Sequence, residues 1–314
     1  MNQTVVPWFI LLGFHNIAID NYKGFLFLAF LLLYVVTISG NLLIIFLVAV
    51  SQSLSSPMYF FLSHLSSCDL LLSSVIVPLM MNIILKVKES ISFFGCITQF
   101  YLFGALATTE CLLLAVMSYD RYVAICNPLR YSSIMDLPKC IQLVFWSWFL
   151  AFTVMLTTAI QMGRLDFCGP NVIDHFFCDL APLLQLSCSD TTFMQIHNII
   201  TGLPATFIPL MYITGTYISI FITIVRIPTK IGRQKAFYTC SSHLTVVSIY
   251  YGTLVVVYLF LSKDHELNIN KVLSLLYTVV TPLVNPIIYS FRNKEIKIAF
   301  SKLVFMKKNQ KALR

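Results

Sequence analysis

Charged residues are scarce in this chain. Only 11% of its 314 residues are Asp, Glu, Lys or Arg, whereas 58% are hydrophobic. A soluble domain carries about 25% charged residues. So much apolar surface cannot be hidden from water in a chain of this length, so the composition excludes a soluble domain and predicts a lipid bilayer as the solvent.

Motifs for chemistry are also missing. The sequence contains no phosphate-binding loop, no His-Glu-x-x-His, no nucleophile motif and no Cys-x-x-Cys pair. The pattern therefore predicts neither an enzyme nor a metal centre. The net charge of +8 does not indicate a nucleic-acid partner, because no dense Lys/Arg run occurs before the C-terminal tail, where basic residues favour anionic membrane lipid. A transporter or channel is disfavoured, since no internal repeat or paired broken helices are found.

Long apolar runs dominate what is present. A helix needs about 20 apolar residues to cross a bilayer, and seven stretches meet this length: 24–50, 57–85, 95–119, 140–162, 194–225, 236–261 and 272–291. The runs are continuous rather than alternating, which disfavours a membrane-spanning barrel. The predicted fold class is an all-α membrane protein, a seven-transmembrane helix bundle with a short amphipathic C-terminal helix.

The Lys and Arg residues set the predicted orientation. With the N-terminus outside, fifteen of the 21 Lys and Arg residues lie on the cytoplasmic side, as the positive-inside rule requires. Asn2-Gln3-Thr4 is a glycosylation sequon, which is used only on the lumenal side. No basic segment precedes the apolar patch at residues 5–12, so the first helix is expected to serve as the insertion signal. We predict a multi-pass plasma-membrane protein with an extracellular N-terminus.

Four of the nine cysteines fall in segments assigned to the outside, where disulfides persist: Cys96, Cys168, Cys178 and Cys188. Four cysteines allow three connectivities, and the spacing alone leaves all three open. The loop at about 163–193 holds three of these cysteines and is long enough to suggest a function. It is predicted either to form a stapled lid or to be an extracellular loop pinned only for stability.

Two acids lie at membrane depth, where ionisable residues are costly and usually functional. At about 1.5 Å per residue, Asp69 lies roughly 18 Å and Glu110 roughly 16 Å from the cytoplasmic ends of their helices. Asn41 and Asn285 fall in the same region. Two neighbouring carboxylates must hold a proton or share a cation. The layer is therefore interpreted as a sodium or proton site, with a static polar knot as the alternative.

The outer halves of the helices are predicted to form a ligand cavity. Their side chains are apolar with a few hydroxyl donors, which suits small, neutral ligands rather than amines. On the third run one face follows the i, i+3, i+4 spacing, and the fifth and sixth runs supply the other walls. The candidates are Phe103, Gly104, Ala107, Thr108, Cys111, Thr201, Ala205, Thr206, Tyr251, Leu254, Val255 and Tyr258. The alternative is that these residues only pack helices.

The segment 117–126, Met-Ser-Tyr-Asp-Arg-Tyr-Val-Ala-Ile-Cys, ends an apolar helix and places Arg121 at the water–lipid interface. The inner end of the sixth run carries basic residues but no acid, so Asp120 is the expected partner of Arg121. Residues 291–305 contain apolar residues interspersed with basic ones and predict an amphipathic helix on the inner leaflet. The segment 307–314 is predicted to be a disordered basic tail.

Several motifs together resemble the odorant receptors, a branch of the rhodopsin-like receptors. They are Gly40-Asn41, Pro57-Met58-Tyr59-Phe60-Phe61-Leu62, the segment 117–126, Lys235-Ala236-Phe237 through Ser242-His243-Leu244, and Pro282-Leu283-Val284-Asn285-Pro286 through Tyr289-Ser290. The resemblance covers essentially the whole chain. Tyr238 departs from it, because Ser is usual at that position beside the G-protein face.

The resemblance implies a receptor for small volatile odorants that couples to a heterotrimeric stimulatory olfactory G protein and raises cyclic AMP. It implies an extracellular N-terminus at 1–23, a seven-transmembrane receptor domain at 24–291, and a cytoplasmic helix and tail at 292–314. It pairs Cys96 with Cys178 and Cys168 with Cys188. The expected switch residues are Asp120, Arg121, Tyr122, Tyr217, His243, Asn285 and Tyr289. No cofactor is expected apart from sodium at Asp69 and Glu110; the alternative function is a receptor for a non-odorant metabolite outside olfactory tissue.

Overall fold

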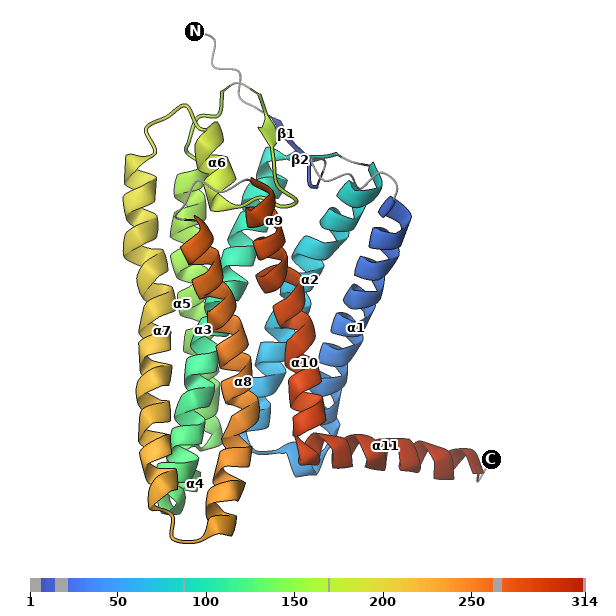
Figure 1. Cartoon of the computed structure of the whole chain (residues 1–314), viewed down its shortest axis with the longest axis vertical. Coiled ribbons are helices and arrows are strands. Elements are labelled where there is room, and N and C mark those ends of the chain that lie inside the picture. Colours follow the sequence, from blue (N-terminus) through green and yellow to red (C-terminus); the bar gives the residue numbers. More distant parts are fainter. Residues whose placement is uncertain (1–6, 15–21, 87, 169, 262–266, 313–314) are drawn as a thin grey trace.

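The computed structural model describes residues 7–14, 22–86, 88–168, 170–261 and 267–312. Long helices stand side by side in a bundle, a small group of strands caps one end, and a last helix turns away from the bundle at the other end (Figure 1). The predicted sequon at Asn2 lies outside the described residues.

The helix bounds agree closely with the apolar runs. The bundle helices are α1 (Lys23–Val50), α2 (Pro57–Lys86), α3 (Phe93–Cys126), α5 (Leu137–Met162), α7 (Thr192–Arg226), α8 (Lys230–Leu261), α9 (Leu267–Leu275) and α10 (Thr281–Arg292). In the described part of the chain, six helical segments are long and apolar enough to cross a membrane: α1, α2, α3, α5, α7 and Lys271–Ser290. Helix α8 completes a seven-helix bundle, and its residues 244–261 contain no Asp, Glu, Lys or Arg. The predicted fold class is confirmed.

The seventh crossing is interrupted. Helices α9 and α10 are joined by a π-helical turn, Leu276–Val280. Pro282 stands at the start of α10 and has no N–H to donate, so the regular hydrogen-bond ladder cannot run through it. The hydroxyl of Thr281 donates to the carbonyl of Leu276 at 3.1 Å instead. A π-turn of this kind is one known cause of a local change in helix direction.

Short elements connect the bundle helices. These are η2 (Gln52–Leu54), η3 (Pro128–Arg130), α4 (Tyr131–Ile134) and α6 (Leu180–Leu186). Ser92 caps α3 by accepting from the backbone N–H of Gly95 at 3.1 Å, and Asp136 caps α5 by accepting from that of Lys139 at 3.0 Å. Such caps satisfy helix-end donors that have no partner within the helix, so these two residues fix where α3 and α5 begin.

Two helix ends differ from the sequence-based expectation. Helix α8 begins at Lys230 rather than near 236, because its first two turns are polar and a hydropathy criterion does not detect helix beyond the bilayer. Helix α11 (Lys294–Ala312) runs on through the segment expected to be disordered. That expectation was wrong for residues 307–312, which are rich in Lys, Gln and Ala, all good helix formers.

A three-stranded sheet covers the outer end of the bundle. Strand β1 (Trp8–Leu11) lies between β2 (Glu89–Ser92), to which it is antiparallel, and β3 (Val172–Ile173), to which it is parallel. Phe9 and Leu11 of β1 are fully buried in an outer apolar cluster together with Phe176 and Phe177. The N-terminal segment is therefore part of a lid, which the sequence did not predict.

Candidate functional site

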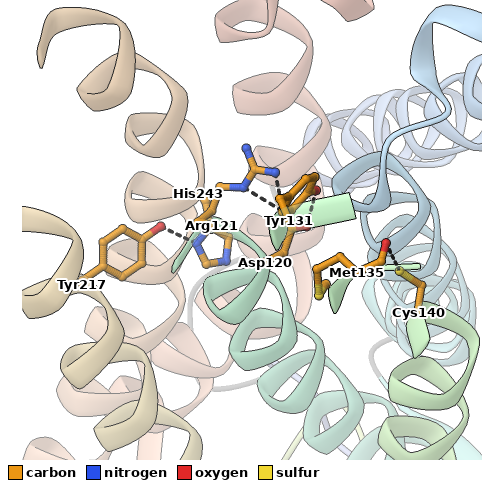
Figure 2. A network of polar contacts seen from close by, with 7 residues as sticks. All are labelled: Asp120, Arg121, Tyr131, Met135, Cys140, Tyr217 and His243. Carbon is orange, nitrogen blue, oxygen red and sulfur yellow. Dashed lines mark hydrogen bonds and ion pairs between the residues drawn. The ribbon is translucent and has the colours of Figure 1, made fainter. Parts of the chain in front are cut away.

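The inner end of α3 carries a buried ion pair (Figure 2). Arg121 Nε donates to Asp120 Oδ2 at 2.9 Å, and a second guanidinium nitrogen contacts the same oxygen. Asp120 is fully buried and Arg121 is 7% exposed. The expectation that Asp120 is the partner of Arg121 is confirmed. Removing one member of a buried ion pair strongly destabilises a protein, because the other charge is left buried without compensation.

Tyr131 completes this network from α4. Its hydroxyl donates to Asp120 Oδ1 at 2.7 Å, so both carboxylate oxygens have partners. Burial, and then the negative charge of Asp120, raise the pKa of Tyr131, which keeps the phenol protonated as a donor. Sequence analysis missed Tyr131, because only the turn after α3 brings it back beside Asp120.

A second polar contact joins α7 to α8. Tyr217 Oη lies 2.6 Å from His243 Nδ1, and the two rings are stacked with centroids 5.8 Å apart. In Figure 2 this pair lies beside Arg121, on the side away from Asp120. Tyr122, also predicted as a switch residue, packs instead against the apolar cluster of Ile220, Ile224 and Cys240 between α7 and α8. The structure thus brings Arg121, Tyr217 and His243 together, and Tyr122 lies beside the contact between α7 and α8.

A cavity of about 680 Å³ opens at this inner end. It is bounded by the start of α2, by Arg121, by the inner turns of α8 and by the junction of α10 and α11. The residues that line it include Tyr59, Arg121, Tyr238, Ser242, Asn293 and Lys294. Tyr59 donates to Asn293 Oδ1 at 2.9 Å, and Lys294 Nζ lies 5.8 Å from the ring centroid of Tyr238. The guanidinium of Arg121 therefore borders a hollow between the helices that a cytoplasmic partner could enter.

The predicted polar layer is present at mid-bundle. Asn285 Nδ2 lies 3.1 Å from each carboxylate oxygen of Asp69, and Glu110 is the adjacent carboxyl group. Asn41 donates to the carbonyl of Pro282 at 3.1 Å and so ties α1 to α10. Asp69 is fully buried and Glu110 is 2% exposed. Tyr289 is fully buried one helical turn below Asn285, and its hydroxyl has no hydrogen-bond partner among the described residues.

The candidate ligand residues of α3 face different neighbours. The ring of Phe103 contacts those of Phe177 and Tyr277, with centroids 5.1 and 5.7 Å away. A methyl group on Gly104 would meet Met155 of α5 at 2.2 Å, so Gly104 lies in a helix contact rather than free for a ligand. The candidate residues of α3 spread over about 140° around the helix axis. This arc is wide enough for its two edges to contact different neighbouring helices.

The central part of that face is already bridged to α8. Tyr250 Oη donates to the backbone carbonyl of Ala107 at 2.9 Å and lies 3.3 Å from Cys111 Sγ. Tyr251 is 4% exposed and its hydroxyl has no partner among the described residues. Thr108 is half-buried. Sequence analysis missed Tyr250, whose hydroxyl contacts two of the candidate ligand residues, Ala107 and Cys111.

The two threonine candidates on α7 offer acceptors rather than donors. Thr201 donates to the carbonyl of His197 at 2.8 Å and Thr206 to that of Gly202 at 3.2 Å. Because each hydroxyl proton is used within its own helix, only oxygen lone pairs remain for a ligand. The expected donors are therefore wrong for these two residues. Ala205 and Leu254 are half-buried, Val255 is 46% exposed, and the side chain of Tyr258 lies outside the described residues.

Both disulfides implied by the resemblance are present. Cys96, at the top of α3, is bonded to Cys178, and Cys168 is bonded to Cys188 within the loop between α5 and α7. Gln99 of α3 adds hydrogen bonds beside the Cys96–Cys178 bridge. Its side-chain nitrogen donates to the carbonyl of Val75, and its side-chain oxygen accepts from the N–H of Cys178, both at 3.0 Å. The loop is thereby fixed over the bundle mouth, which agrees with both interpretations of this segment.

A buried cation reinforces this lid. Lys271 of α9 is fully buried and pairs with Asp174 at 2.5 Å. The adjacent His175 lies 3.3 Å from the hydroxyl of Ser274 and packs against the rings of Phe176 and Phe177. The sequence alone does not indicate that Lys271 is buried, because only the tertiary fold brings it under the lid.

The lid should make stability depend on pH. Burial, and then the positive charge of Lys271, lower the pKa of His175 to about 3. Histidine in the unfolded chain has a pKa of about 6.5. Between about pH 6.5 and about pH 3 the unfolded state therefore binds a proton that the folded state does not bind, so stability falls as the pH drops through this range. At pH 5 the loss from this group is about 2 kcal/mol.

Thermal unfolding of the purified protein at pH 7 and pH 5 tests this expectation. His175→Asn should reduce the difference in unfolding temperature between the two pH values. His197→Asn serves as the matched control, because that histidine lies between α5 and α7 rather than under the lid. A pH dependence that is unchanged in His175→Asn would contradict the assignment.

The seven-helix bundle, the inner Arg121 network and the disulfide-bonded lid together define a membrane receptor rather than an enzyme. The olfactory receptor family model matches residues 30–308. Olfactory receptor 5G9 of Mus musculus is 47% identical over 305 residues, which cover 96% of each chain. Olfactory receptor 5G3 of Homo sapiens is 47% identical over 98% of this chain and 97% of its own, and human olfactory receptor 11L1 is 45% identical over 96% and 94%.

The chain therefore belongs to the olfactory receptor family of G-protein-coupled receptors. Members of this family are multi-pass proteins of the plasma membrane and are not enzymes. The position of the basic residues agrees with the same topology, because the Arg121 end of the bundle is the end with excess Lys and Arg.

Proposed function

We propose that this protein is an odorant receptor that binds small, mostly apolar volatile molecules within the helix bundle and activates a stimulatory olfactory-type G protein, which raises cyclic AMP. The observation that carries the proposal is the combination of family membership with the inner cavity beside Arg121. A receptor for a non-odorant metabolite has no specific observation in its favour.

The chemistry of the candidate ligand residues supports neutral ligands. Apart from one glycine, one cysteine and the hydroxyl groups, they are hydrocarbon side chains, and Thr201 and Thr206 can accept but not donate a hydrogen bond. Alcohols and other weak donors would therefore pair with them better than pure acceptors. A volatile of about ten heavy atoms is limited to micromolar affinity, about −8 kcal/mol.

The mechanism is a shift in populations. A ligand moves the equilibrium only if it binds the active arrangement more tightly than the inactive one. The contact of Tyr250 with Ala107 and Cys111 joins α8 to α3 at the level of the candidate cavity, and the contact of Tyr217 with His243 joins α8 to α7 further in. A ligand that disturbs the first would favour outward movement of the inner end of α8. Ligand and G protein would then raise each other's affinity by the same factor.

Cyclic AMP in cells that co-express this chain with an olfactory-type stimulatory G protein tests the proposal. A panel of neutral volatiles should include a compound that produces a dose-dependent rise. A rise that is equally large in cells lacking the receptor would overturn it, as would a panel of broad chemistry that gives no response in cells with verified surface expression.

We further propose that Asp69 and Glu110 hold a sodium ion or share a proton, and that this state couples α2, α3 and α10. The two buried carboxyl groups are adjacent, and the amide of Asn285 faces one of them. Mutual repulsion prevents both from being ionised without a cation. Among the described residues no group of three His, Cys, Asp or Glu is found, which fits a monovalent ion or a proton rather than a transition metal.

Asp69→Asn should remove the dependence of basal signalling on sodium concentration, because it removes a charge of the proposed site while retaining its shape. The measurement is basal cyclic AMP in permeabilised membranes with sodium replaced by a large organic cation. Asn41→Ala is the control, since it disturbs the same layer without changing its charge. Sodium dependence that persists in Asp69→Asn would contradict the ion site.

A further inference from the structure

A groove of about 600 Å³ lies between α7 and α8. Its walls include Ile218 and Phe221 of α7 and Leu244 and Val255 of α8, all of which are substantially exposed, between 38% and 65%. In a membrane protein such exposed apolar residues face the hydrocarbon of the bilayer. The groove is therefore a hollow on the lipid-facing surface, separate from the inner cavity beside Arg121, and its lining includes two of the candidate ligand residues, Tyr251 and Val255.

Small residues create the hollow. A methyl group on Gly252 would meet nothing within 4 Å, so this glycine leaves open space in the wall of α8. The hydroxyl of Ser248 donates to the carbonyl of Leu244, and that of Thr214 to the carbonyl of Leu210, both at 2.8 Å. Both groups are satisfied within their own helices, so apart from the phenol groups of Tyr217 and Tyr251 the groove presents a hydrocarbon surface.

The inner end of the groove leads towards a basic edge. Below Phe221, the buried cluster of Ile220, Ile224 and Cys240 closes the contact between α7 and α8. Arg226 follows five residues after Phe221, roughly 7.5 Å further along the helix. Lys230 and Arg233 stand in the first turns of α8, and all three basic residues are exposed. The short connection that joins the two helices brings these basic residues to one end of the bundle (Figure 1).

No acid of α7 or α8 offsets this positive edge. The sequence contains no Asp or Glu between Asp190 and Asp264. The basic end is the cytoplasmic one, and the cytoplasmic leaflet is the leaflet rich in anionic lipid. An apolar groove that ends beside unbalanced cations matches a molecule with a hydrocarbon tail and a negative head.

We propose that the groove between α7 and α8 binds an anionic phospholipid of the cytoplasmic leaflet, with one acyl chain along Gly252 and Phe221 and its phosphate at Arg226 and Lys230. From Leu210 to Phe221 the groove follows eleven residues of α7, roughly 16 Å, which accommodates most of an acyl chain. Each basic residue near the membrane surface strengthens the attraction of an anionic head group about fivefold.

The bound lipid would also act on the receptor switch. Tyr217 borders the groove, and its hydroxyl is the group that lies against His243 of α8. Outward movement of the inner end of α8 would change the width of the groove, so the lipid would bind the two arrangements unequally and shift their populations. This consequence rests on the proposed receptor function, whereas the binding of lipid does not.

Lipid retention tests the binding. The full-length receptor is reconstituted in vesicles of phosphatidylcholine with a minor share of phosphatidylserine, extracted in mild detergent, and its retained lipids are quantified by mass spectrometry. Wild type should retain phosphatidylserine about fivefold above its bulk share. Gly252→Leu, which fills the hollow, should lower total retained lipid, and Arg226→Gln should lower the preference for phosphatidylserine.

Gly215→Leu is the matched control. Gly215 is also exposed with nothing within 4 Å of an added methyl group, but it does not line the groove. Equal retention by wild type and Gly252→Leu, or retention at the bulk ratio in wild type, would overturn the proposal.

A second measurement guards against misfolding of Gly252→Leu. Phe221→Trp places an indole in the groove, and its fluorescence should be quenched more strongly by phosphatidylserine brominated on its acyl chains than by brominated phosphatidylcholine at the same mole fraction. The signal of wild type, from Trp8, Trp146 and Trp148, is subtracted. Equal quenching by the two lipids would show that the groove has no preference for the anionic lipid, and would also overturn the proposal.

Discussion

Arg121→Ala is expected to abolish the cyclic AMP response to an odorant. Arg121 is a buried cation that borders the inner cavity, and it is held there by Asp120 and, through that carboxylate, by Tyr131. An arginine at the centre of an interface commonly contributes about 2 kcal/mol or more, so G-protein binding should weaken by roughly thirtyfold. The measurement is the odorant dose–response curve for cyclic AMP, normalised to the amount of receptor at the cell surface.

Two controls separate signalling from folding. Arg130→Ala makes the same substitution at an exposed arginine nine residues further along the chain and should leave the response unchanged. Arg121→Ala also strands the buried carboxylate of Asp120, which can destabilise the protein by about 3–5 kcal/mol. The double variant Arg121→Ala, Asp120→Asn removes that stranded charge. If its surface expression recovers and its response returns as well, Arg121 is not needed for coupling.

Cys96→Ser is expected to give the largest loss of stability. The Cys96–Cys178 bridge closes a separation of 82 residues and joins the top of α3 to the lid, with both cysteines fully buried. Removing a native disulfide destabilises a protein by about 2–5 kcal/mol. We expect a fall in the unfolding temperature of the purified receptor and a large reduction in its surface expression.

The second bridge provides the comparison. Cys168–Cys188 closes only 20 residues, and both of its cysteines are exposed. The stabilisation that a disulfide gains from loop closure is smaller by about 1 kcal/mol for this shorter loop. Breaking this bridge also leaves no buried thiol. Cys168→Ser should therefore lower the unfolding temperature less than Cys96→Ser. The reverse order would contradict the assignment of Cys96–Cys178 as the bridge that fixes the lid.

Much of the site could be predicted from local sequence, and the misses share one cause. Asp120 and Arg121 are adjacent in sequence, so their pairing needs no knowledge of the fold. Tyr131, Tyr250 and Lys271 were missed because each reaches its partner from another element, 11 to 143 residues away. Spacing along one helix also could not show that Gly104 lies against Met155, because that depends on which helix is its neighbour.

The sequence by itself determined the class of fold, the seven crossings and their orientation. A helix that crosses the bilayer requires about 20 consecutive apolar residues, so each crossing can be recognised from one continuous segment of sequence. Only the tertiary structure decided that β1 joins the lid, that Lys271 is buried against Asp174, and that a groove opens between α7 and α8. These features depend on which side chains meet across helices, and hydropathy, which describes one segment against its solvent, does not contain that information.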